Sequence, residues 1–149
     1  MKDFKKLNLG CGNDKLRGFV NADVSSLCNP DIICRLGRDL PFKDNSFEEV
    51  RVLNILCQIE TNAEFVKAMN ELHRITSGFI HIRVPNALDE CAFQDPMDCR
   101  RFTTESFTYM QHGHRRYEQY GYHYGFLPFT VELLTNNGRQ MEFKLCPVK

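Results

Sequence analysis

A glycine-flanked turn followed by an acid is the first feature of the sequence that can do chemistry. Gly10 and Gly12 flank Cys11 after a short apolar segment, and Asp23 ends the next β-like segment. Glycines at such a turn let a ligand approach the backbone. A carboxylate accepts hydrogen bonds from both hydroxyls of a ribose. The pattern predicts a nucleoside or nucleotide site.

The spacing of this pattern discriminates between nucleotides. In the dinucleotide pattern G-x-G-x-x-G the third glycine is missing, because Lys15 stands there. Asp23 comes about half as far along the chain as the ~20 residues that separate the glycines from the acid in dinucleotide sites. Both departures count against a dinucleotide oxidoreductase. A ligand with a ribose and no required pyrophosphate fits better, and S-adenosylmethionine has that shape.

Several further motifs, in order, carry a resemblance to a known family. The chain resembles the class I S-adenosylmethionine-dependent methyltransferases, and it is most similar to their small, short-loop branch. The similarity runs from Leu7 to about Met110 and extends loosely to the terminal hairpin. It is carried by LNLGCGNDKLRGFVNADV, DLPFKDNSFEEV, ELHRI, FIHIRVPN and DPMDCRRFTTESFTYM.

The resemblance implies a cofactor, S-adenosylmethionine, and a set of residues that bind it. Asp23 would hold the ribose, and Asn8 stands where the family often has an acid near the methionine amine. The segment 54–59 would face the sulfonium. A valine at Gly10 is expected to block the cofactor while leaving the chain folded. The implied cofactor-binding residues are Asn8, Gly10, Cys11, Gly12, Asp23 and Asn54.

The sequence departs from the family pattern at four positions. Arg35 stands where an acid near the adenine is common, and Cys57 and Gln58 replace the last two residues of the family's LEH. Asp98 stands where a histidine is expected. These departures keep a second interpretation open. In it, the chain is a cofactor-binding, catalytically weak protein that acts as a partner subunit or sensor.

Methyl transfer is an in-line displacement, so the protein mainly aligns the reactants and excludes water. A base is needed only where the acceptor must lose a proton. The carboxyl ends of the strands are where open α/β sheets bind ligands. Asp95 before Pro96 also fits a simple turn, and the histidines also fit an ordinary loop. The catalytic candidates after the fifth predicted strand are Asp95, Asp98 and His123, with His112 and His114 beside them.

The elements that must position these residues alternate in type. Apolar spacing over 61–75 predicts a helix that Asn62 caps and that Ser77 and Gly78 end. The segment 103–112 reads as a short helix capped by Thr103 or Thr104. The order predicts an α/β fold in one domain, 1–149, with a doubly wound, mostly parallel Rossmann-like methyltransferase sheet and a C-terminal antiparallel hairpin around Asn137 and Gly138. Strands are expected at 7–9, 18–24, 31–36, 48–56 and 79–84.

Composition limits the classes of function and partner. The chain has 149 residues, 42% of them apolar and 26% charged, with a formal net charge of zero. This balance gives no basis for capture of nucleic acid or of an anionic membrane. No apolar run approaches the ~20 residues of a membrane span, and no signal-peptide core is present, so a cytoplasmic protein is expected. Seven cysteines without C-x-x-C spacing predict free, mostly buried thiols and no metal site.

The short connection between Gly12 and Gly18 has room for about one helical turn. One sheet face would therefore be thinly covered. Parallel sheets normally bury both faces. A homodimer in which the aromatic segment 102–129 covers the second copy is one solution, and folding of the same aromatics over their own sheet is the other. The expected substrate is a small-molecule or sugar-like acceptor.

Overall fold

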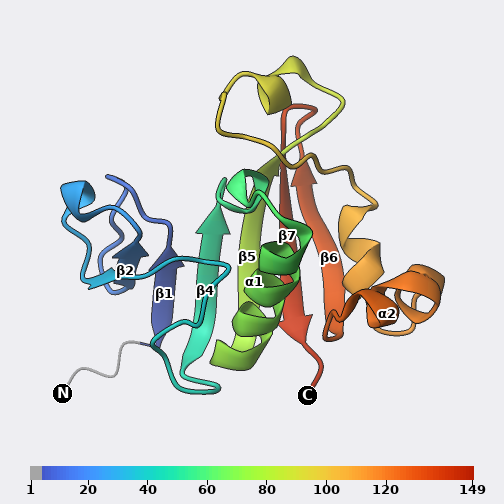
Figure 1. The fold of residues 1–149 in the computed structure, drawn as a ribbon, viewed down its shortest axis with the longest axis horizontal. Helices are drawn as coiled ribbons and strands as arrows, with labels where there is room; N and C mark the ends of the chain where they lie inside the picture. The colour runs from blue at the N-terminus through green and yellow to red at the C-terminus, as the bar shows by residue number, and fades with distance from the viewer. Residues whose placement is uncertain (1–4) are drawn as a thin grey trace.

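The protein is built on one mixed sheet, seen in a computed structural model that describes residues 5–149. The strand order is β3-β2-β1-β4-β5-β7-β6. The first five strands run parallel, and β7 is antiparallel to both β5 and β6 (Figure 1). This topology confirms the predicted α/β sheet and its terminal hairpin. The strands are β1 (Lys6–Leu9), β2 (Val20–Asp23), β3 (Ile32–Ile33), β4 (Phe47–Leu53), β5 (Thr76–Pro85), β6 (Phe129–Asn136) and β7 (Gln140–Pro147).

The helix α1 (Asn62–Ile75) is the longest of the described helices, and its apolar side is buried as the spacing predicts. Its cap is Thr61, whose hydroxyl accepts from the Glu64 amide at 3.2 Å. The prediction of Asn62 as the cap is wrong by one residue, since both residue types cap helices. No helix stop follows, because the chain passes directly into β5. Gly78 serves close strand packing: a Cβ there would overlap the Glu48 carbonyl oxygen.

Three elements differ from the prediction in where they begin or end, or in helix type. The third strand is only Ile32–Ile33. The fourth ends at Leu53, because Asn54 takes a left-handed backbone with φ of 58°. The segment expected as a short helix from 103 forms the 3-10 helix η4 (Ser106–Met110), whose cap Glu105 makes no side-chain capping bond.

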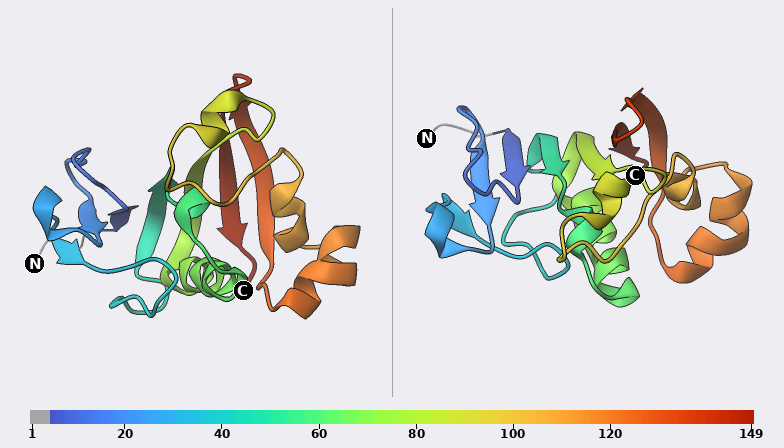
Figure 2. Two further views of the ribbon diagram at one scale, coloured as in Figure 1. Left: turned by 45° about the horizontal axis from the view of Figure 1, so that its top comes forward. Right: turned by 90° about the horizontal axis from the view of Figure 1, so that it is seen from above.

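All the helices lie on one side of the sheet (Figure 2). On this side the strands contribute buried Val50, Val52, Ile80 and Ile82, among others. The connections β1–β2 and β2–β3 contain no α-helix, and the second holds only the 3-10 helix η1 (Ser26–Cys28). The second face is therefore without helical cover.

Charged side chains occupy that second face. Glu49 pairs with Lys6 at 3.0 Å and with Arg51 at 2.8 Å. On the neighbouring strands Glu142 pairs with Arg83 at 3.0 Å. Phe19, from the β1–β2 connection, lies against the Lys6 and Arg51 cations at 5.5 and 5.0 Å. Alternation of apolar and charged residues lets this parallel sheet present one face to water, a pattern usual for antiparallel sheets.

The aromatic segment folds over its own sheet. Phe102 stacks on Phe107 with ring centres 5.5 Å apart, and Phe107 lies 4.7 Å from Phe143 of β7. Phe126 and Phe129 are also buried. These rings are therefore not available to cover a second copy. The homodimer stays a prediction, and its interface would have to use other residues. None of the helices in residues 5–149 is long and apolar enough to span a membrane.

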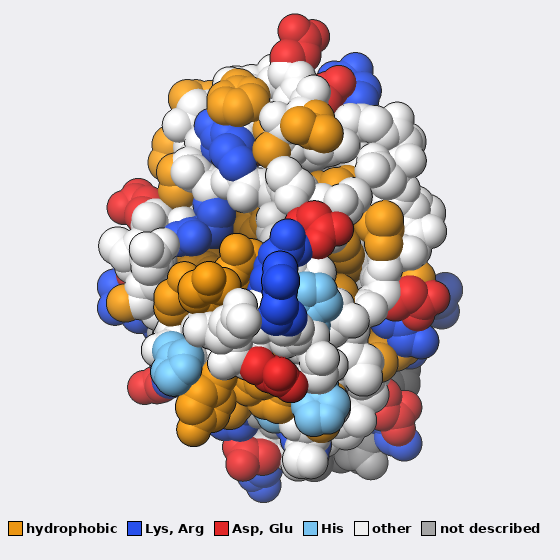
Figure 3. Space-filling view, turned by 90° about the vertical axis from the view of Figure 1, so that its right-hand side faces the viewer, with side chains coloured by type: hydrophobic (Ala, Val, Ile, Leu, Met, Phe, Trp, Pro, Cys, Tyr) orange, Lys and Arg blue, Asp and Glu red, His pale blue; other side chains and the backbone are white. Residues whose placement is uncertain are grey.

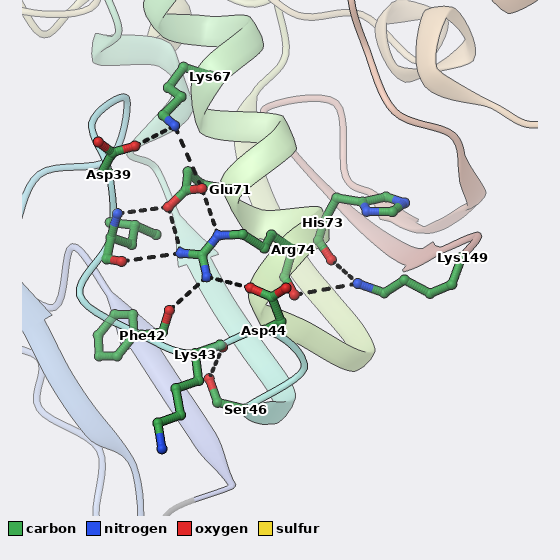
Figure 4. Close-up of polar contacts among 11 residues, drawn as sticks. Asp39, Phe42, Lys43, Asp44, Ser46, Lys67, Glu71, His73, Arg74 and Lys149 are labelled. Carbon is green, nitrogen blue, oxygen red and sulfur yellow. Dashed lines mark hydrogen bonds and ion pairs between the residues drawn. The ribbon is translucent and has the colours of Figure 1, made fainter.

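An ion pair on α1 holds the helix-free connection between β3 and β4 (Figure 4). Glu71 accepts from both Nε and Nη2 of Arg74 at 2.8 Å and from the Leu40 amide at 2.7 Å. Arg74 donates in turn to the carbonyls of Leu40 and Phe42 and to the Asp44 carboxylate. Side chains of α1 thus replace the packing that a helix would supply to this connection.

Glu71→Gln is predicted to lower the free energy of unfolding at neutral pH by about 1.5–3 kcal/mol, the range for hydrogen bonds to charged groups. The Arg74 guanidinium holds the pKa of Glu71 below its usual value. This stabilisation is present above the unfolded pKa of about 4.3 and is lost as the pH falls through the folded pKa, so the two proteins converge in acid.

Urea unfolding across the acidic range measures this difference. Asp44→Asn is the matched control, because Asp44 contacts the same guanidinium but is 72% exposed. A loss below about 1 kcal/mol is expected for it. Equal losses in the two variants would contradict the assigned role of the buried pair.

Candidate functional site: two adjoining cavities at the strand ends

The glycine turn follows β1 and is tied to β2. The amides of Gly10 and Cys11 both donate to the Ala22 carbonyl, at 2.8 and 3.0 Å. A Cβ at Gly10 would overlap the Ile55 side chain, so internal packing already requires a glycine there. At Gly12 nothing lies within 4 Å of the Cβ position. Gly12 is therefore the glycine that leaves open space beside the turn.

Asp23 closes the turn from the end of β2. One carboxylate oxygen accepts from the Gly12 amide at 2.9 Å, and the other accepts from the Ser25 amide at 2.9 Å. Each carboxylate oxygen can accept more than one hydrogen bond. Asp23 therefore orders the turn and keeps acceptor capacity.

A first cavity of about 340 Å³ opens beside Gly10 and Asp23. Two apolar residues on its wall, Val24 and Met97, are 60% and 65% exposed. Apolar walls with a few placed polar groups are typical of small-molecule sites, and the volume lies at the lower end of their range. The lining residues are Leu9, Gly10, Asp23, Val24, Cys34, Arg35, Leu36, Ile55, Gln58, Ile59, Glu60, Glu64 and Met97.

Four of the six predicted cofactor residues lie outside this lining: Asn8, Cys11, Gly12 and Asn54. The Asn8 amide donates to the Asp14 carbonyl and to Asn21 Oδ1, both at 3.0 Å, and is only 4% exposed. Asn21 also accepts from the Leu16 amide at 2.9 Å. Asn8 therefore orders the β1–β2 connection from within. Cys11 is likewise buried and does not line the cavity.

Cys11 belongs to a cluster that sequence spacing did not reveal. Its sulfur, the Cys28 sulfur and an Asp23 oxygen lie within 4.8 Å of one another, which is a distance that allows shared metal ligation. Burial first, then Cys28 and Asp23, raise the pKa of Cys11 to about 11. A metal would have to displace that proton, and the Cys28 thiol already donates to the Ser25 carbonyl.

The cysteines are less buried than predicted. All seven are free thiols, as expected, but only Cys11 and Cys57 are buried, and Cys99 is exposed. The prediction of a mostly buried set is wrong because most of the cysteines lie in connections and on the margins of the core.

A second cavity of about 450 Å³ adjoins the first at the carboxyl ends of β4 and β5. Gln58, on the 3-10 helix η2 (Leu56–Gln58), lines both cavities. Its side-chain amide donates to Asp95 at 3.5 Å. The lining residues are Asn54, Gln58, Pro85, Cys91, Gln94, Asp95, Asp98, Asn137, Arg139 and Gln140.

This second cavity contains buried oxygens without donors. Asn54 Oδ1, Asp98 Oδ1 and Gln140 Oε1 have no hydrogen-bond partner within the described chain. Buried polar atoms are nearly always paired, so several unpaired acceptors around one cavity indicate a ligand or solvent that donates. Gln140 and Arg139 come from the terminal hairpin. Only the pairing of β7 with β5 brings them here, so local sequence gave no signal for them.

The two predicted acids differ in their surroundings. Asp95 Oδ1 accepts from the Met97 amide at 2.9 Å, whereas Asp98 Oδ1 is unpaired. The loop that carries Asp98 is fixed because the amides of Cys99 and Arg100 both donate to the Cys57 carbonyl at 2.9 Å. Burial first, then a hydrogen bond with the Asp98 carboxylate, raise the pKa of Cys57 to about 12, so this thiol stays protonated.

The histidines lie elsewhere. His123 is on α2 (Tyr122–Tyr124), and neither it nor His112 or His114 lines the two cavities. Figure 3 shows several histidines on one outer face, between hydrophobic and charged side chains. The structure therefore brings Asp95 and Asp98 together and leaves His123 apart from them.

Comparisons with known proteins agree with this architecture. No protein-family model and no curated protein matches the chain significantly. Solved structures do match. A protein of Pyrococcus horikoshii superposes with a TM-score of 0.66 at 16% identity, covering 96% of this chain and 81% of that one. A SAM-dependent methyltransferase of Methanosarcina mazei gives 0.61 at 12% identity, covering 97% and 92%.

A putative methyltransferase of Haloferax volcanii, solved in complex with a methyltransferase activator, gives a TM-score of 0.59 at 13% identity, covering 97% of this chain and 82% of that one. At such identities the likeness establishes the fold. The chain has the class I S-adenosylmethionine-dependent methyltransferase fold, and the resemblance that the motifs indicated is confirmed at that level.

Gly10→Ala is predicted to destabilise the protein by about 1–3 kcal/mol, because the added methyl meets Ile55 and the backbone has a φ of 75°. The expectation that a bulky residue at Gly10 leaves the fold intact is therefore corrected. In a double-mutant cycle, Ile55→Ala should recover part of the loss measured by urea unfolding. Additive losses would mean that Ile55 is not what excludes a side chain at Gly10.

Proposed function

We propose that this chain is an S-adenosylmethionine-dependent methyltransferase that acts on a small, hydroxyl-rich, sugar-like acceptor. The observation that carries the proposal is the shared wall: Gln58 lines both the cavity beside Gly10 and Asp23 and the polar cavity beside Asp98. A methyl donor and its acceptor must meet in line across a short distance. Two cavities that share a lining residue adjoin one another, as sites for a methyl donor and its acceptor must.

The first cavity fits the nucleoside end of the cofactor. Asp23 offers acceptor capacity for the ribose hydroxyls, and Val24 and Met97 offer apolar surface for an adenine. The open space at Gly12 lets a ligand approach the turn. S-adenosylmethionine supplies an activated methyl group when it is bound.

The second cavity fits an acceptor that donates hydrogen bonds. The unpaired oxygens of Asn54 and Gln140 can each accept from a hydroxyl. Asp98 Oδ1 is unpaired too, and it is the carboxylate placed to take the proton of the reacting hydroxyl. Asp95 already accepts hydrogen bonds from the Met97 amide and the Gln58 side chain, so it holds the wall of the second cavity in place.

The alternative is a cofactor-binding protein without turnover. It is favoured by Arg35, which lines the first cavity where the family commonly has an acid, and by Asn8, whose amide is used inside the protein. The two functions differ in catalysis rather than in binding, so one experiment can separate them.

That experiment offers S-adenosylmethionine together with a panel of monosaccharides and inositols and follows S-adenosylhomocysteine release by mass spectrometry. Wild type is expected to turn over with a member of the panel. Asp98→Asn should lower the rate by about 10²–10⁴-fold, the usual contribution of a general base, while calorimetry shows unchanged S-adenosylhomocysteine binding.

Asp95→Asn is the matched comparison and should lose less than about tenfold, because its carboxylate is already occupied. An unchanged rate in Asp98→Asn would remove the assigned base. Cofactor binding by wild type with no turnover on any member of the panel would favour the sensor or partner-subunit function.

A further inference from the structure

A third cavity, of about 880 Å³, lies away from the proposed methyl-transfer site. It opens between α1 and the segment that follows β5, and it shares no lining residue with the two cavities described above. Its wall is formed by Asn62, Ala63, Phe65, Val66, Arg100, Arg101, Phe102, Ser106, Tyr109, Met110, Tyr124 and Phe126.

The guanidinium of Arg100 lies among the lining residues of this cavity and has no carboxylate partner in residues 5–149. Arg100 donates to the Ile59 carbonyl at 3.3 Å and to Asn62 Oδ1 at 3.1 Å, and it lies over the Phe65 ring at 4.4 Å. All these partners are neutral. Burial lowers the pKa of Arg100 below its usual value, the direction expected for a desolvated cation without a counter-ion.

The guanidinium of the next residue, Arg101, contacts residues that do not line this cavity. Its Nη1 donates to the Asp98 carbonyl at 2.9 Å, and its guanidinium lies over Phe93 at 4.4 Å. Its Nε is buried and has no hydrogen-bond partner. Arg100 is therefore the cation that this cavity offers to a ligand.

The rest of the wall is largely aromatic. Tyr109 and Tyr124 stack with ring centres 6.4 Å apart and planes at 15°, and Phe65 meets Phe126 edge to face at 5.8 Å. Flat rings of this kind favour a flat apolar ligand, since aromatic groups stack or meet edge to face. The fork of N–H groups on the Arg100 guanidinium suits the two oxygens of a carboxylate.

We propose that this cavity binds a small aromatic carboxylate, with its ring against Phe65, Tyr109 and Tyr124 and its carboxylate on Arg100. The site is independent of methyl transfer: it uses other residues and another ligand chemistry. Its occupant supplies the counter-ion that Arg100 lacks.

The chain supplies its own reporter for this site. It has no tryptophan, and its five tyrosines all fall between Tyr109 and Tyr124, two of them on the cavity wall. Tyrosine fluorescence therefore reports on this segment. Titration of the full chain with phenylacetate should give a saturable change. Phenylacetamide, which keeps the ring and lacks the charge, and acetate, which lacks the ring, should bind at least about tenfold more weakly.

Arg100→Gln should weaken phenylacetate binding by at least about tenfold. Arg101→Gln should keep it, because the Arg101 guanidinium contacts Asp98 and Phe93 outside the cavity lining. Arg115→Gln is the matched control, because Arg115 is an exposed arginine of the same segment that does not line the cavity. It should bind phenylacetate as wild type does. Urea midpoints near that of wild type verify that the variants are folded.

Several outcomes would overturn the proposal. Equal binding of phenylacetamide would make the cavity a general apolar groove. An equal loss in Arg115→Gln would indicate diffuse charge attraction. Undiminished binding in Arg100→Gln, or no saturable change with phenylacetate, would remove Arg100 as a carboxylate site.

Discussion

The structure depends on the shortness of the connections between its first strands. Only ten residues separate the end of β1 from the start of β2, and no α-helix fits there. Every helix therefore lies on one side of the sheet, and the other side must be compatible with water (Figure 2). Ion pairs such as Lys6–Glu49 and Arg83–Glu142 meet that requirement. Exposed pairs add little stability, but they avoid an apolar face that would drive association.

The same constraint shapes the candidate site. No helix begins after the glycine turn, so no helix N-terminus points at a ligand there. The turn is held by side chains instead. Asp23 accepts from the Gly12 amide, and Asn8 donates to Asn21 beneath the connection between β1 and β2. The same carboxylate, Asp23, thus stabilises the turn and is the group proposed to bind the ligand. On the other side of the sheet, α1 uses Glu71 and Arg74 to hold another helix-free connection.

The sequence predicted what depends on local pattern and on adjacent parallel strands. The apolar period of α1 and the Asn137-Gly138 hairpin are observed. Gly12 and Asp23 meet because the carboxyl ends of β1 and β2 lie side by side. Gln140 and the Arg100–Tyr124 cavity depend on long-range packing, which no local spacing encodes. It was also impossible to predict from local sequence that packing requires a glycine at position 10. Ile55, which excludes a side chain there, is 45 residues further along the chain and contacts Gly10 only in the fold.

The central claim is that the cavity at Gly10 and Asp23 takes a nucleoside next to an acceptor cavity. A crystal structure of the protein with S-adenosylhomocysteine tests it most directly. The account predicts the ribose hydroxyls on the Asp23 carboxylate, the adenine against Val24 and Met97, and the sulfur on the side that faces Gln58. A nucleoside bound in another cavity, or none bound at saturating concentration, would contradict the account.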